Sequence, residues 1–326
     1  MTEEYTFDVG RNRVFAELEG SIAAAGTLGI QVLDAGGNET LRDFFRMTTP
    51  AINAKKDKAV VFDIGGTTIR MLSNSRLITS METTGEIVSA TINEKGWIVV
   101  CNQERGTSLD IVTVYSEIGN AEYIVRMATG YVLSAQLSPD NRSLAILNMT
   151  EYGSRISYYN LNSETIDRAF DYPSEIILDI RFLISGEVLA ISTQSLFIIG
   201  RNNESEKIYE FAGRQLGGYA LNDNYVTLYL LDYSVGYSGQ LITIGEDRNI
   251  LGEVSFDREV ISISTSDTYL SVLRSDKLIF FNTALEEIPG DEDPGLITGA
   301  TIVLALNSGK ALLAGDHFAT IVSGDS

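Results

Sequence analysis

A short apolar run recurs eight times along this chain, and this repeat constrains the fold more than any other feature. The runs are four to six residues long, as in Ala59–Phe62 and Leu144–Leu147, and each follows a tight turn carrying Gly, Asp or Asn. Successive turns lie 37 to 46 residues apart, at Gly20, Asp57, Gly96, Asp140, Gly186, Asp223, Asp267 and Gly309. A period of about 40–45 residues with four strands per repeat is typical of β-propeller blades.

A second kind of strand follows each run, with more alternation between apolar and polar residues, as half-buried strands have. A four-stranded sheet buries both faces only when it packs between two neighbours, and stacking the sheets in a ring satisfies all of them. We therefore predict an all-β fold, a β-propeller of eight four-stranded blades, with seven blades as the alternative. The second strands are Gly29–Leu33, Thr68–Leu72, Ile111–Tyr115, Arg155–Tyr159, Leu196–Ile199, Leu241–Ile244, Leu278–Phe281 and Phe318–Val322.

The two ends of the chain complement each other. The last repeat holds Thr301–Leu306, Lys310–Gly315 and Phe318–Val322 and stops one strand short. The segment Tyr5–Val9 is a spare strand before the first complete repeat. We predict that the N-terminal strand 5–9 completes the last blade, which closes the propeller and makes residues 1–326 a single domain.

The charge balance excludes several classes of partner. The chain has 24 Lys and Arg against 44 Asp and Glu, a formal net charge of −20. Such a field repels nucleic-acid phosphates and anionic lipid surfaces. No apolar stretch reaches the roughly 18 residues of a membrane helix. We therefore expect no nucleic-acid partner, membrane contact only through a segment absent from this chain, and a soluble monomer.

Four sequence features suggest chemistry, and each has a plainer structural interpretation. The segment 63–67, Asp-Ile-Gly-Gly-Thr, is similar to a phosphate-binding loop of sugar kinases, but it lies where the repeat requires a hairpin turn. His317 is the only histidine and Cys101 the only cysteine, which leaves no multi-histidine metal site and no disulfide. The acidic loop 290–295 lacks the ligand spacing of a calcium loop. We predict no catalytic residues, metal or cofactor.

Three connections after the buried strand are longer than the others, at Asn102–Asp110, Asn148–Ser154 and Leu231–Gly239. Connections of this kind should project from one face of a propeller. Aromatic and Arg residues on loops are typical of recognition surfaces. The candidate binding residues are Glu104, Arg105, Tyr152, Tyr233 and Tyr237; ordinary variation in loop length is the alternative.

Several stretches give the chain a family resemblance. They include Tyr5–Arg11, Gly29–Asp34, Asp63–Gly66, Ser108–Tyr115 and Leu137–Ala145. The chain resembles a domain-of-unknown-function family of bacterial propellers from Gram-positive anaerobes, WD-repeat-like and quinoprotein-like in architecture. The resemblance implies a propeller behind one membrane helix, hence an extracytoplasmic, membrane-anchored domain, and it supplies no active-site residues.

We therefore expect a non-catalytic binding or interaction propeller, with an unknown protein or a glycan as partner. The alternative is a carbohydrate-active hydrolase or lyase on the same scaffold. Such chemistry needs two carboxylates at a fixed separation, and the 44 acidic residues leave that alternative open.

Overall fold

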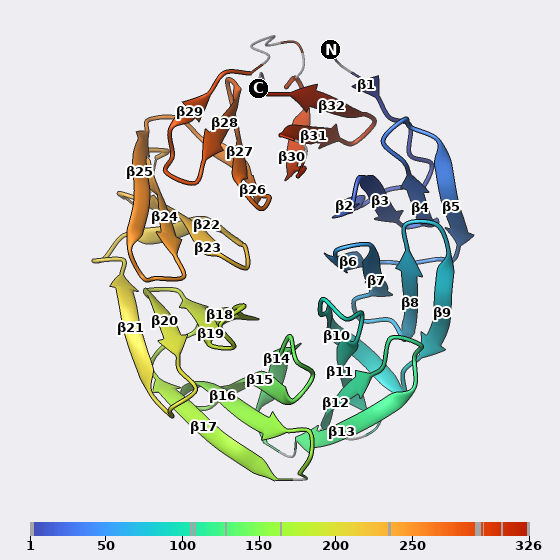
Figure 1. Ribbon diagram of the computed structural model, residues 1–326, viewed down its shortest axis with the longest axis vertical. Helices are drawn as coiled ribbons and strands as arrows, with labels where there is room; N and C mark the ends of the chain where they lie inside the picture. The colour runs from blue at the N-terminus through green and yellow to red at the C-terminus, as the bar shows by residue number, and fades with distance from the viewer. Residues whose placement is uncertain are drawn as a thin grey trace. The chain divides into compact units, whose positions relative to one another are not determined.

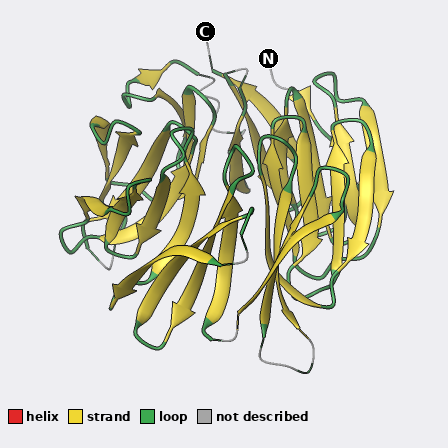
Figure 2. Ribbon diagram, turned by 60° about the horizontal axis from the view of Figure 1, so that its bottom comes forward, coloured by secondary structure: helices red, strands yellow, loops and turns green. Residues whose placement is uncertain are grey.

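The computed structural model describes residues 3–104, 106, 109–127, 129–163, 165–233, 236–290, 295, 297–307 and 309–324. Within these residues the chain forms eight four-stranded antiparallel sheets (Figure 1) and no helix (Figure 2). In particular, the described residues contain no helix that could span a membrane. The predicted all-β fold with eight blades is confirmed, and the seven-blade alternative is wrong.

The chain divides into two compact units, and the division falls within β21. The larger unit is Asp8–Lys207, and the smaller unit combines Met1–Phe7 with Ile208–Ser326. The assignment of the whole chain to a single domain stays a prediction.

The larger unit carries five sheets of consecutive strands, and each fully buried run predicted for this unit is the second strand of its sheet. The sheets are β2 (Val14–Leu18), β3 (Ser21–Gly26), β4 (Gly29–Leu33) and β5 (Glu39–Phe44); β6 (Pro50–Lys55), β7 (Lys58–Asp63), β8 (Thr68–Ser73) and β9 (Leu77–Glu82); β10 (Gly85–Ile92), β11 (Ile98–Glu104), β12 (Asp110–Tyr115) and β13 (Ala121–Met127); β14 (Tyr131–Leu137), β15 (Ser143–Thr150), β16 (Gly153–Asn160) and β17 (Ile166–Pro173); and β18 (Ile177–Phe182), β19 (Val188–Ser192), β20 (Ser195–Ile199) and β21 (Ser205–Glu210).

The smaller unit carries three sheets, of which the last takes a strand from the N-terminus. They are β22 (Gln215–Leu221), β23 (Tyr225–Leu231), β24 (Gly239–Gly245) and β25 (Ile250–Phe256); β26 (Val260–Thr265), β27 (Tyr269–Arg274), β28 (Leu278–Asn282) and β29 (Glu287–Ile288); and β30 (Ala300–Ala305), β31 (Lys310–Gly315) and β32 (Ala319–Ser323) with β1 (Glu3–Glu4).

The N-terminal strand completes the last sheet, but over different residues from those predicted. Strand β1 pairs with β32 through Glu3 and Glu4, and the Tyr5 amide donates to the Ala319 carbonyl at 2.8 Å. After Tyr5 the chain leaves the sheet. The sequence alternation over Tyr5, Phe7 and Val9 is real, since all three side chains are buried. This buried alternation is typical of a strand over 5–9, but the structure assigns the strand to Glu3–Glu4, so the predicted range was wrong.

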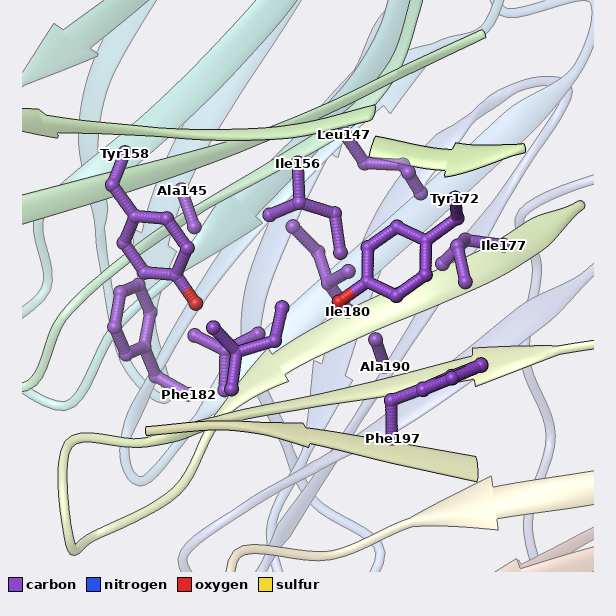
Figure 3. Close-up of a cluster of buried hydrophobic side chains, with 12 residues drawn as sticks. Ala145, Leu147, Ile156, Tyr158, Tyr172, Ile177, Ile180, Phe182, Ala190 and Phe197 are labelled. Atoms are coloured by element: carbon purple, nitrogen blue, oxygen red, sulfur yellow. The ribbon is translucent and has the colours of Figure 1, made fainter. Parts of the chain in front are cut away.

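Apolar cores fill the space between consecutive sheets within each unit. The cluster in Figure 3 joins β15–β17 to β18–β20, with Tyr158 edge-on to Phe182 and Tyr172 edge-on to Phe197. Its members are Ala145, Leu147, Ile156, Tyr158, Tyr172, Ile177, Ile180, Phe182, Val188, Ala190, Phe197 and Ile199. Comparable clusters join other neighbouring pairs. No sheet could bury these faces alone, so stacking is what stabilises the repeat.

The antiparallel order gives every sheet two distinct ends. One end of each sheet, which we call the 2–3 end, holds the connection from the second strand to the third. The first strand begins at this end, and the fourth strand finishes there. The 1–2 and 3–4 connections lie at the opposite end, the 1–2 end. Six first strands carry a register shift one to three residues from their start, as at Val132/Ser134 in β14. Such bulges re-aim side chains near the end of a strand.

Candidate functional site

The structure places the predicted binding residues in separate units. Glu104 ends β11 in the larger unit, where its amide donates to the Leu109 carbonyl at 3.0 Å. Tyr152 forms part of the β15–β16 turn of the same unit. Tyr233 and Tyr237 lie in the β23–β24 connection of the smaller unit, and Arg105 lies outside the described residues. No single site formed by all five is therefore described.

Exposed aromatic side chains share one feature: they lie at the 2–3 ends of their sheets. Tyr152, Tyr233 and Tyr237 are in 2–3 connections, Phe44 ends a fourth strand and Tyr131 begins a first strand. The prominently exposed apolar residues at the 1–2 ends are instead aliphatic, as with Ile118 and Ile184. Tyr and Phe bring large contact areas with few rotatable bonds, so this end is the better suited to recognition.

A pocket of about 700 Å³ lies at the 2–3 end of the β14–β17 sheet. Tyr131 and Tyr152, 68% and 74% exposed, line it together. Its remaining wall comes from three neighbouring segments, listed here in chain order: Thr129, Gly130, Met149, Thr150, Glu151, Gly153, Ser154, Arg155, Asp171, Tyr172 and Pro173. A volume of this size suits a small ligand or the anchor of a larger one.

The backbone under Tyr152 is fixed on both sides. Strands β15 and β16 pair up to Thr150 and Gly153, so residues 151 and 152 form a two-residue turn. The Tyr152 amide donates to Thr150 Oγ1 at 3.3 Å, and its carbonyl accepts from the Ser174 amide at 2.8 Å. Gly153 has φ 146°, and a Cβ there would collide with the Tyr172 carbonyl oxygen. The long loop predicted over Asn148–Ser154 is therefore wrong, because both strands extend to the turn.

Tyr131 is held by a different route. It pairs with Met149 across the first two strands, and the next residue, Val132, donates its amide to Asp110 Oδ2 at 2.6 Å. Asp110 is 4% exposed and begins β12 of the preceding sheet. This side chain thus anchors the start of β14 to the sheet before it. Two sheets together position the ring.

An ion pair supplies the polar wall of the pocket. Arg155 and Asp171 are directly opposite on β16 and β17, with Nε and Oδ1 3.6 Å apart. Both side chains are substantially exposed, so the pair contributes little to stability. It places a guanidinium and a carboxylate beside the rings, and among the described lining residues only Glu151 adds further charge. The sequence interpretation missed Tyr131, Arg155 and Asp171. Tyr131 could have been found from the sequence. It follows Gly130 in the connection that leads into a first strand, and first strands begin at the same end of the sheet as the 2–3 turn.

The phosphate-loop-like segment is a hairpin turn between β7 and β8, as predicted. Its backbone amides already have partners: Ile64 donates to Thr49, Gly65 to Ile87 and Gly66 to Asp63. The Asp63 carboxylate accepts from the amides of Thr48 and Thr49 at 2.9 and 2.6 Å. These donors are thus used within the fold rather than left to cradle a phosphate.

The other sequence candidates also have structural positions. Cys101 is 1% exposed in the core, and burial raises the pKa of its thiol to about 12. His317 is exposed in the β31–β32 connection. Most of the acidic loop 290–295 lies outside the described residues. Where residues are described, no group of three or more His, Cys, Asp and Glu is arranged to share a metal ion.

The carboxylates of Asp110, which is buried, and Asp179, which is half-buried, both accept hydrogen bonds from backbone amides. Asp110 holds Val132, as above. On β18, Asp179 accepts from the Ile180 amide at 2.8 Å, and burial raises the pKa of its carboxyl.

Solved structures define the class of this fold. The chain is similar to the C-terminal WD40 domain of Sif2, at 11% identity and a TM-score of 0.65, over 99% of each chain. It is similar to the WD40 domain of SCAP from fission yeast, at 10% identity and 0.64, over 100% of this chain and 95% of that one. A streptogramin B lyase structure matches at 12% identity and 0.57, over 100% and 98%. These likenesses show a β-propeller fold.

Within that class, the chain belongs to a family of unknown function, DUF5711, whose model matches residues 1–284. A search of curated proteins finds no match.

Proposed function

We propose that this protein is a non-catalytic binding domain that recognises a protein or glycan partner through the 2–3 ends of its sheets. The observation that carries this proposal is the pocket at which Tyr131 and Tyr152 are both exposed beside the Arg155–Asp171 pair. Large aromatic rings next to a few polar groups are the composition of a recognition site.

The backbone geometry supports this role. Exposed tyrosines on a mobile loop would lose conformational entropy on binding, but Tyr152 is on a two-residue turn with its amide and carbonyl already bonded. A site that is ordered before binding avoids much of the entropic cost.

The enzyme alternative has weaker support. A lyase is among the structural neighbours, but at 12% identity this likeness shows only a shared fold. The buried Asp110 and the half-buried Asp179 each accept a hydrogen bond from a backbone amide. Such contacts suit a structural role, whereas glycosidic cleavage needs a pair of carboxylates facing a substrate.

We also propose an extracytoplasmic, membrane-anchored location in the cell, on the family resemblance. Protease added to intact cells should then degrade the domain. If it is degraded only after lysis, the location is wrong.

The pocket proposal is tested by affinity capture from cells that make the protein. We expect the wild-type chain to retain at least one partner, and Tyr131→Ala/Tyr152→Ala to reduce the amount of that partner captured by at least about tenfold. Truncating a central aromatic anchor typically costs more than about 1 kcal/mol of binding free energy. Ile118→Ala is the matched control, since Ile118 is 63% exposed at the 1–2 end of the same unit. Thermal unfolding verifies that each variant is folded. Loss with Ile118→Ala but not with the tyrosine pair would contradict the proposal.

A further inference from the structure

The pocket offers two kinds of surface that rarely suit the same ligand. The rings of Tyr131 and Tyr152 are broad, apolar and exposed. Arg155 and Asp171, together with Thr129, supply hydrogen-bond donors and acceptors around them. A ligand that fits must therefore have flat apolar faces and many hydroxyl-like groups. Pyranose sugars have both, since axial C–H groups form a face that packs on an aromatic ring while the hydroxyls point outward.

Charge restricts the ligand further. The positive charge of Arg155 is neutralised by Asp171, and Glu151 leaves the lining slightly acidic. The whole chain has a net charge of −20. An anionic ligand would be repelled, and a cationic one would have to compete with Arg155 for Asp171. A neutral ligand can instead hydrogen-bond to both partners without separating them.

Main-chain groups beside the two rings already have hydrogen-bond partners. Tyr131 is paired with Met149, the Tyr152 carbonyl accepts from Ser174, and the Ser154 amide donates to the Glu175 carbonyl at 3.1 Å. Peptides that bind as added strands need unpaired main-chain groups. Beside the rings, this arrangement favours recognition through side chains, as in carbohydrate binding.

We propose that the Tyr131–Tyr152 pocket binds a neutral carbohydrate chain, with the rings stacking on sugar faces and the Arg155–Asp171 pair bonding to hydroxyls. This inference rests on the proposed function, because it names the ligand class of the same site.

Calorimetric and NMR titrations of the full chain test it with defined probes: cellotetraose, maltotetraose and chitotetraose as neutral sugars, polygalacturonate as an anionic sugar, and tetralysine as a cationic peptide. We expect at least one neutral tetrasaccharide to bind with a Kd below about 1 mM and to shift the resonances of the pocket residues. Tyr152→Ala should weaken it at least tenfold, Tyr152→Phe should retain it within about threefold, and Ile118→Ala should not change it. Polygalacturonate and tetralysine should bind more weakly than that sugar.

Two outcomes would overturn the inference: no binding by any of the three neutral probes, or binding that Tyr152→Ala leaves unchanged. If either outcome is found while affinity capture still depends on Tyr131 and Tyr152, the pocket recognises another ligand class and the proposed function stands. If capture is also independent of the two tyrosines, both proposals fail.

Discussion

Replacing Tyr158 with alanine should lower the free energy of unfolding by about 3–5 kcal/mol, whereas replacing it with phenylalanine should not lower it. Tyr158 is 2% exposed and packs edge-on against Phe182 in the core between two sheets (Figure 3). It also packs edge-on against Phe170. The guanidinium of Arg168 lies over the same ring, 4.3 Å from its centroid. Alanine removes all of these contacts and leaves a cavity.

The hydroxyl makes the comparison with phenylalanine informative. Tyr158 Oη is buried and has no hydrogen-bond partner among the described residues. Removing an unpaired buried polar group relieves its desolvation cost, so Tyr158→Phe should be neutral or stabilising by about 1–2 kcal/mol. Chemical denaturation of both variants measures the difference. A loss with Tyr158→Phe as large as with Tyr158→Ala would mean that the hydroxyl, not the ring, contributes the stability.

Deleting residues 1–7 should lower the melting temperature by at least about 5 °C. The deletion removes β1 from the edge of β32 and two side chains, Tyr5 and Phe7, that are 4% and 7% exposed. Burying two aromatic side chains contributes roughly 3–6 kcal/mol in total. The exposed edge of β32 would also become open to pairing with other chains, so aggregation should increase.

Point variants separate the two contributions. In the full-length chain, Tyr5→Ala/Phe7→Ala tests the packing alone, and Thr6→Ala is the matched control because Thr6 is exposed between them. Differential scanning calorimetry provides the measurement. An unchanged melting curve after the deletion would show that the N-terminal segment does not hold the last sheet together.

The repeat could be predicted from sequence because its signals are local. A fully buried second strand needs an unbroken apolar run, and a tight turn needs Gly, Asp or Asn, so both are visible in short segments such as Ala59–Phe62 after Asp57. The extent of β1 could not be predicted, because the buried alternation of Tyr5, Phe7 and Val9 resembles a strand, whereas the structure assigns the strand to Glu3–Glu4.

The candidate site was only partly predictable, for related reasons. Asn148, Met149 and Thr150 are not a typical strand sequence, yet they pair with β16 because the partner strand continues beside them. Tyr152 was predicted to lie in an exposed connection between two strands, and it does. Its neighbour Tyr131 lies 21 positions earlier in the chain, and the pocket exists only because the sheet brings the start of β14 beside the β15–β16 turn.

Recognition at the 2–3 ends of the sheets can be tested in the cell. Site-specific photo-crosslinking tests it most directly, with a benzophenone amino acid placed at Tyr152 or at Ile118, in cells that make the protein. The two positions are 74% and 63% exposed at opposite ends of sheets in the same unit. Benzophenone inserts into C–H bonds, so it captures protein and carbohydrate partners alike. We expect a light-dependent adduct from position 152 and none from position 118; an adduct from position 118 alone would contradict recognition at the 2–3 ends.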